Sequence, residues 1–92
     1  MYEVEIEVKS VKGYCSAEYK EGDKIVIKEP VIDTSRTNCD ICIYTIPSLI
    51  SYITAFSRKT SEDDWINMLE ELQCPDSANT VAFKISRKNL VD

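Results

Sequence analysis

The chain begins with an alternation of apolar and charged residues. Four apolar residues at every second position are separated by residues with charged side chains. The apolar set is Tyr2, Val4, Ile6 and Val8, and the charged set is Glu3, Glu5, Glu7 and Lys9. A period of two is typical of a strand that buries one face and exposes the other. The pattern therefore predicts a first strand with an acidic outer face.

Two further segments have the composition of strands. Residues 24–28, KIVIK, follow a polar segment and end before Glu29-Pro30. Residues 80–86, TVAFKIS, place Val81, Phe83 and Ile85 on one side. Lysines in both segments are suitable cross-strand partners for the glutamates of the first strand, because opposite charges on an exposed sheet face favour pairing. We therefore expect the first strand to lie between the other two.

The period changes after a polar loop at residues 33–38. Apolar residues then recur every three or four positions, which predicts a helix with one apolar face. They are Cys42, Ile46, Leu49, Ile53 and Phe56. Asn38 or Asp40 is a suitable cap for the start of this helix. Because the apolar stripe continues through Pro47 without a change of phase, we expect a kink at this proline rather than a new helix.

A second helix is predicted between Ser61 and Cys74. Ser61 is a suitable cap with Asp64 as its reciprocal partner, and the acidic residues 62–64 suit the positive end of a helix dipole. The apolar stripe of this helix comprises Trp65, Met68, Leu69 and Leu72. Pro75 should end it. The order β–β–α–α–β predicts a single α+β domain over residues 1–92. In it, a three-stranded antiparallel sheet with the first strand central packs one face against two helices.

The charge and the apolar content narrow the classes of partner. Eleven basic against sixteen acidic residues give a net charge of −5. An acidic chain without a basic stripe is unsuited to phosphate backbones and to anionic lipid, so we expect neither nucleic-acid nor membrane binding. The apolar run at residues 41–56 is broken by Pro47 and by polar residues, which argues against a membrane span. The N-terminal residues lack the layout of a signal peptide, so we expect a cytoplasmic protein.

Four cysteines, Cys15, Cys39, Cys42 and Cys74, are the main candidates for chemistry. A reducing cytosol makes structural disulfides unexpected. Four thiolates suit zinc or an iron–sulfur cluster, and the step from Cys39 to Cys42 lets two sulfurs face one ion. Zinc modules usually carry two close pairs and this chain has one, and reduced cysteine is often simply buried, so packing stays an open alternative. A redox dithiol is a further alternative, in which Cys39 at a helix N-terminus would have a lowered pKa.

Acid–base catalysis has little support in the sequence. The chain contains no histidine, which removes the commonest general base and any Cys–His pair. Helix capping accounts for the carboxylates at residues 62–64. We therefore expect no catalytic residues. The expected function is a small metal- or thiol-binding module acting with an unidentified protein partner, and the alternative is an interaction domain whose cysteines only pack.

Several short motifs in a fixed order carry a resemblance to a known family. They are VKGYCSA at 11–17, GD at 22–23, Cys39 opening a segment that contains Pro47, and CPD at 74–76 before NTVAFKISR. With them the chain resembles a small family of uncharacterised proteins of fewer than a hundred residues, found mainly in anaerobic bacteria and archaea. No activity of that family carries over to this chain.

The resemblance also bears on the cysteines. It implies that those matching Cys15, Cys39 and Cys74 are the usual ones, that Cys42 is additional, and that Tyr19 stands where a histidine is common. Either Cys42 takes the fourth place of a metal site or no four-ligand site exists. We expect Cys15, Cys39 and Cys74 to converge at one end of the sheet with Cys42 nearby, although the place of Cys42 on the apolar stripe first indicates packing.

Overall fold

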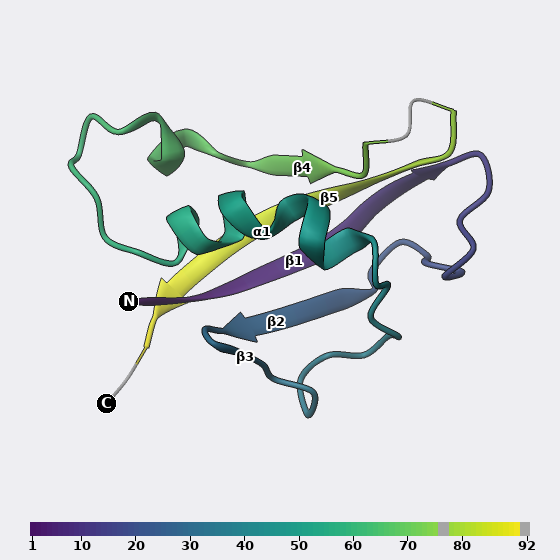
Figure 1. Ribbon diagram of the computed structural model, residues 1–92, viewed down its shortest axis with the longest axis horizontal. Coiled ribbons are helices and arrows are strands. Elements are labelled where there is room, and N and C mark those ends of the chain that lie inside the picture. The colour runs from purple at the N-terminus through teal and green to yellow at the C-terminus, as the bar shows by residue number, and fades with distance from the viewer. Residues whose placement is uncertain (76–77, 91–92) are drawn as a thin grey trace.

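The computed structural model describes residues 1–75 and 78–90, and within them five strands form one antiparallel sheet (Figure 1). The strands lie in the order β3-β2-β1-β5-β4. Their bounds are Tyr2–Lys12 for β1, Lys24–Lys28 for β2, Val31–Ile32 for β3, Glu71–Gln73 for β4 and Thr80–Asn89 for β5. The long strands β1 and β5 pair along most of their length and form the centre of the sheet.

The charged face of β1 has the neighbours that its composition predicts. Glu7 lies opposite Lys24 of β2 and also opposite Lys84 of β5. The register of β1 and β5 shifts between Val8 and Ser10. One extra residue at this bulge reverses the alternation, so that Val11 lies opposite the buried Val81. The first strand can therefore continue to Lys12, beyond the point where its simple period ends.

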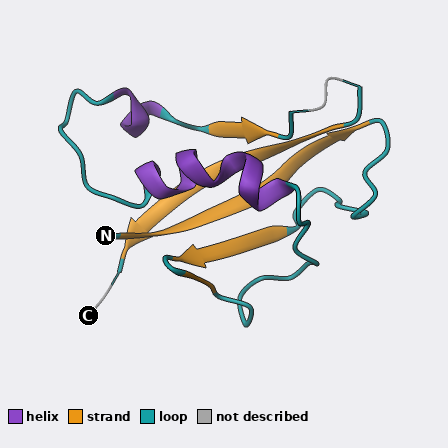
Figure 2. Ribbon diagram, viewed as in Figure 1, coloured by secondary structure: helices purple, strands orange, loops and turns teal. Residues whose placement is uncertain are grey.

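Helix α1, Thr45–Phe56, lies across one face of the sheet (Figure 2). Its residues Leu49, Ile53 and Phe56 are buried, in agreement with the predicted apolar stripe. The expected start near Asn38 and the kink at Pro47 are wrong. The helix begins at Thr45, so Pro47 lies in the first turn, where a backbone N–H has no intrahelical acceptor and its absence does no harm.

The predicted second helix is also wrong, and with it the predicted fold class. In the described residues, the segment after α1 contains a single turn of 3-10 helix, η1, Trp65–Met68, followed by the edge strand β4. Asp64 caps η1 by accepting the Ile66 N–H, and the backbone becomes extended at Leu69. Leu72 then reaches the core from a strand paired with β5. Residues 1–75 and 78–90 thus contain five strands and one α-helix instead of the expected three strands and two helices.

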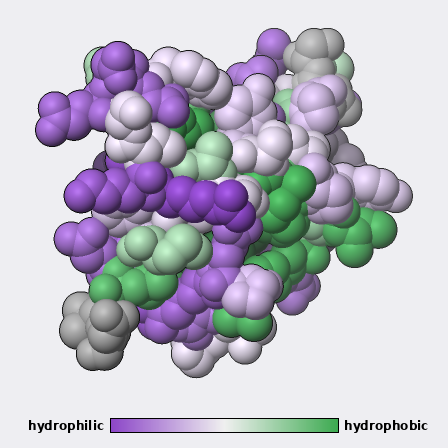
Figure 3. Space-filling view, turned by 60° about the vertical axis from the view of Figure 1, so that its left-hand side comes forward, coloured by the Kyte–Doolittle hydropathy of each residue, from purple (hydrophilic) through white to green (hydrophobic). Residues whose placement is uncertain are grey.

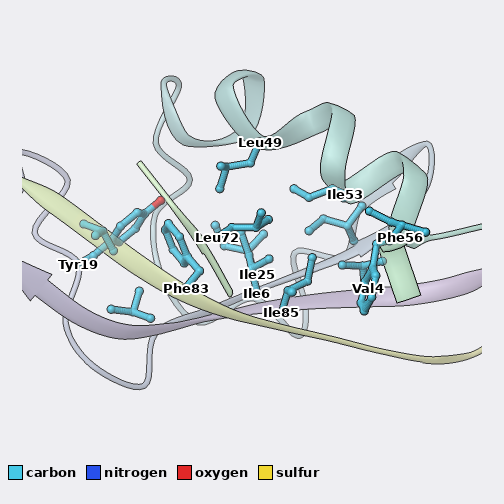
Figure 4. Close-up of a cluster of buried hydrophobic side chains, with 14 residues drawn as sticks. Val4, Ile6, Tyr19, Ile25, Leu49, Ile53, Phe56, Leu72, Phe83 and Ile85 are labelled. Atoms are coloured by element: carbon cyan, nitrogen blue, oxygen red, sulfur yellow. The ribbon is translucent and has the colours of Figure 1, made fainter. Parts of the chain in front are cut away.

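The core lies between the sheet and α1 (Figure 4). Its buried residues come from four strands, from α1, from η1 and from the loop between β1 and β2. They are Val4, Ile6, Val8, Tyr19, Ile25, Ile27, Leu49, Ile53, Phe56, Ile66, Leu72, Val81, Phe83 and Ile85. Tyr19 packs its ring edge-on against Phe83, with the centroids 6.0 Å apart. This contact anchors the loop between β1 and β2 to the sheet.

The opposite face of the sheet is held by ion pairs. Glu3 is almost fully buried there and pairs with both terminal nitrogens of Arg36 and with Lys88 at 3.3 Å. The Arg36 hydrogen bonds hold the pKa of Glu3 below its usual value in spite of burial.

Figure 3 shows hydrophilic side chains over much of one side of the molecule, with hydrophobic ones in separate groups. No helix in the described part of the chain is long and apolar enough to span a membrane.

Candidate functional site

Three of the four cysteines line one cavity at the end of the molecule where α1 begins. Cys15 comes from the loop between β1 and β2, Cys42 from the segment before α1, and Cys74 from the residues after β4. The cavity has a volume of about 330 Å³, and Tyr14, Tyr44 and Thr45 also line it. All four cysteines, which lie in the described part of the chain, are free and half-buried. Three residues with free thiols thus line a cavity of a size that can hold a small ligand.

Close contacts between loops shape the rim of this cavity. Gly13 has a φ of +77°, and a β-carbon built on it would lie 2.6 Å from the Ala78 carbonyl oxygen, so any larger residue would push the two loops apart. Next to it, the Tyr14 N–H donates to Asn79 Oδ1 at 2.9 Å. These contacts fix the loop that carries Cys15 against Ala78 and Asn79.

Tyr19 fixes the segment that carries Cys42. Its hydroxyl oxygen accepts the Cys42 N–H at 2.8 Å, and its ring is held in the core beside Phe83. Burial raises the pKa of Tyr19 above its usual value, so the phenol is neutral at physiological pH. A neutral hydroxyl oxygen in a fixed position therefore sets where the backbone of Cys42 lies.

The start of α1 stabilises the Cys42 thiolate. Burial alone would raise the pKa of Cys42, but the N–H groups of Tyr44 and Thr45 and the Thr45 hydroxyl interact with its sulfur and bring the pKa below the usual value. Among the described residues, the side chain of the N-cap residue Tyr44 makes no capping hydrogen bond. The first N–H groups of a helix favour negative charge, so the place of Cys42 just before α1 suits a thiolate.

Thr45 connects two of the thiols. Its side chain is only 1% exposed, and its Oγ1 lies 3.8 Å from the sulfur of Cys74 while the same hydroxyl interacts with Cys42. The Thr45 N–H also donates to the Cys42 carbonyl oxygen at 3.2 Å. One buried residue thus orients Cys42 at the end of the helix and Cys74 across from it.

Cys39 lies in different surroundings. It lines a separate hollow with Asp23, Asn38 and Asp40, and its Sγ contacts the Lys24 carbonyl oxygen at 3.6 Å. Burial, followed by the negative charges of Asp23 and Asp40, raises its pKa. The prediction of a low-pKa Cys39 at a helix N-terminus is therefore wrong. Since α1 begins later than expected, Cys42 has that environment.

The structure brings together Cys15, Cys42 and Cys74, whereas the sequence predicts convergence of Cys15, Cys39 and Cys74. In residues 1–75 and 78–90 no three histidine, cysteine or carboxylate side chains are grouped closely enough to hold a metal ion. Zinc with four thiolates would require the sulfurs to lie within about 4 Å of one another. The contributions of Tyr19 and Thr45 were not predicted, because neither stands in a recognisable motif with a cysteine.

Comparison with known proteins gives no further guide to the site. No family model, no curated protein and no solved structure matches the chain. The resemblance to a small family from anaerobic microbes stays a prediction that rests on its short motifs. The function has to be argued from the cavity itself.

Proposed function

We propose that this protein is a thiol-binding module that captures a small disulfide or similar thiol-reactive ligand at Cys42. The observation that carries the proposal is the place of Cys42, just before the start of α1 and at the edge of a 330 Å³ cavity, together with the lowered pKa of its thiol. A thiolate is the reactive form of cysteine, and a lowered pKa increases its fraction at neutral pH. The module acts by binding, without catalytic turnover.

The chemistry at Cys42 is thiol–disulfide exchange. The Cys42 thiolate attacks one sulfur of the ligand disulfide, a new S–S bond forms, and the other half of the ligand leaves as a thiolate that takes a proton from water. Cys15 and Cys74 line the same cavity. We place this chemistry in the cytoplasm, where a reducing environment keeps the free cysteines available.

Exposed apolar residues next to the cavity support action with a protein partner. Ile43 and Tyr44 directly follow Cys42, and each is 74% exposed. Large side chains with that exposure gain by being covered on association. A partner that covers them would also close the mouth of the cavity over the captured ligand.

The competing interpretation is an interaction domain in which the cysteines only pack. All four cysteines do contact the core cluster, so packing accounts for part of their environment. Packing alone does not account for the stabilised thiolate of Cys42, because a purely apolar site raises the pKa of a thiol. Reactivity towards a disulfide therefore separates the two interpretations.

The test is the formation of a mixed disulfide with glutathione. The fully reduced protein is incubated with glutathione disulfide near neutral pH, and the modified cysteine is located by peptide mass spectrometry. We expect one glutathionyl group per chain, at Cys42. Cys42→Ser should abolish it, and Cys39→Ser is the matched control that should retain it. Modification first at Cys39, or equal slow modification of all four cysteines, would show that the thiol-binding proposal is wrong.

A further inference from the structure

A second cavity lies against the later part of α1, next to η1. It has a volume of about 370 Å³, near the lower end of the range for small-molecule sites. Residues of α1 and of the segment 60–66 line it, among them Tyr52, Ala55, Thr60, Asp64, Trp65 and Ile66. None of its lining residues lines the cysteine cavity, so its role is independent of the thiol chemistry.

Two aromatic side chains form walls of this cavity. The rings of Tyr52 and Trp65 lie with their centroids 6.4 Å apart and their planes at 74° to each other. They are 41% and 64% exposed, so their π surfaces are available to a ligand. A cation is attracted over the face of a ring, and two rings packed edge to face leave the faces outside their mutual contact free for a bound group.

The third contribution is negative charge. One carboxylate oxygen of Asp64 accepts the Ile66 N–H at 3.0 Å, which fixes this side chain at the cavity. Asp64 forms no ion pair with any residue in the described ranges. Glu62 and Asp63 precede it, and the segment 60–68 contains no basic residue. Arg58 and Lys59 lie just before this segment and do not line the cavity.

We propose that this cavity binds an organic cation, namely an alkylated ammonium group. Such a group spreads its charge over methyl groups, so it loses less hydration than a bare ammonium and packs against aromatic faces. The rings of Tyr52 and Trp65 attract the cation, and the Asp64 carboxylate supplies the opposite charge. A neutral apolar group of the same shape gains only the packing. The sequence pattern predicts a buried position for Trp65, so this site could not be inferred from it.

The test compares a cation with its neutral isostere. Choline and 3,3-dimethyl-1-butanol differ in one atom, nitrogen for carbon, and both are titrated at constant ionic strength. Trp65 is the only tryptophan of the chain, so its indole N–H signal in the NMR spectrum reports on the cavity. We expect choline to bind about fivefold more tightly than the isostere, because cation–π attraction at an exposed site and the charge of Asp64 act together. Equal affinities would overturn the proposal.

Two pairs of variants locate the effect. Asp64→Asn removes the charge and keeps a residue that caps well, whereas Asp63→Asn removes the same charge from an exposed neighbour outside the cavity. We expect Asp64→Asn to lower the preference for choline to about twofold, the part that the rings alone supply, and Asp63→Asn to leave it unchanged. Tyr52→Leu keeps the apolar contact and the helix, and should weaken choline while sparing the isostere. Equal losses in the two aspartate variants would contradict a site at Asp64.

Peptides separate the two sources of such a cation. A short peptide with one trimethyl-lysine is compared with the unmodified peptide and with choline. Tighter binding of the modified peptide than of choline would assign the cavity to a modified protein, and equal binding would assign it to a free small molecule. Binding of the unmodified peptide as tight as that of the modified one would contradict recognition of an alkylated ammonium.

Discussion

Removal of the Tyr19 hydroxyl tests how the fold positions Cys42. Tyr19 is 6% exposed, its ring packs edge-on against Phe83, and its oxygen accepts the Cys42 N–H at 2.8 Å. Tyr19→Phe keeps the ring and its burial and removes only the oxygen. The Cys42 N–H then loses its acceptor in a half-buried position.

The magnitude follows from that one lost hydrogen bond. A neutral hydrogen bond contributes about 0.5–1.5 kcal/mol net, and leaving a partly buried donor without a partner moves the loss towards the upper end. We expect Tyr19→Phe to lower the free energy of unfolding by about 1–2 kcal/mol. For a domain of this size, 1 kcal/mol lowers the melting temperature by roughly 4–8 °C.

The assay is urea and thermal unfolding under reducing conditions, with Tyr14→Phe as the control. Tyr14 is 71% exposed, and loss of its hydroxyl should change the free energy of unfolding by less than about 0.5 kcal/mol. The same variants are tested for alkylation of Cys42, which should slow in Tyr19→Phe because the sulfur is held less firmly against the N–H groups of α1. Equal stability of the two variants would refute the anchoring role of Tyr19.

Three further predictions concern charged side chains that are partly buried in the fold. Glu3→Gln should lower the free energy of unfolding by about 1–3 kcal/mol, because Glu3 is buried and accepts from Arg36. Glu7→Gln on the same face should change it by less than about 0.5 kcal/mol. Urea unfolding of both variants checks this. Because Arg36 lowers the pKa of Glu3 below its usual 4.5, this contribution is complete above that pH and is lost as the pH falls through the lower, folded-state pKa. Acidification should therefore lower the free energy of unfolding of the unchanged protein more than that of the Glu3→Gln variant. Parallel acid unfolding curves for the two proteins would contradict this prediction. Arg87→Lys keeps the charge but loses the hydrogen bonds to the Phe56 carbonyl and Asn67, so unfolding experiments should show a loss of about 1–2 kcal/mol rather than none.

Part of the fold is visible in the sequence because it depends on local alternation. The charges of Glu3, Glu5 and Glu7 on one face of β1 identify β2 and β5 as its neighbours, since unlike charges meet across strands. The buried stripe of α1 is likewise a matter of spacing within twelve residues. Such patterns can be recognised because residues that share one face of a strand or helix recur at a fixed spacing along the chain.

The helix expected in the segment 61–74 is wrong because tertiary pairing overrides the helical spacing of its apolar residues. Trp65, Met68 and Leu72 fit a helical period, yet Trp65 and Met68 are 64% and 80% exposed and only Leu72 is buried. Leu72 lies in a three-residue strand, too short for an alternation to be recognised. Its extended conformation is stabilised by pairing with β5, which only the folded chain reveals.

The same limit applies to the cysteines. The CxxC spacing suggests that Cys39 and Cys42 act together, but α1 begins only three positions after Cys42, so only Cys42 is near the N–H groups of the helix. Cys39 instead points to a carbonyl oxygen and two carboxylates. The opposite pKa shifts of the two thiols depend on where the helix begins, and the sequence placed that start too early.

Differential alkylation of the four cysteines tests the central claim most directly. The native, reduced protein is treated briefly with iodoacetamide over a range of pH, and the labelling of each cysteine is quantified by peptide mass spectrometry. The lowered pKa of Cys42 and the raised pKa of Cys39 predict that Cys42 is labelled at lower pH than Cys39 and most rapidly of the four near neutral pH. Denatured protein, in which the environments are equal, should show no such order. If Cys39 is labelled at lower pH than Cys42 in the native protein, the assignment of Cys42 as the reactive thiol is wrong.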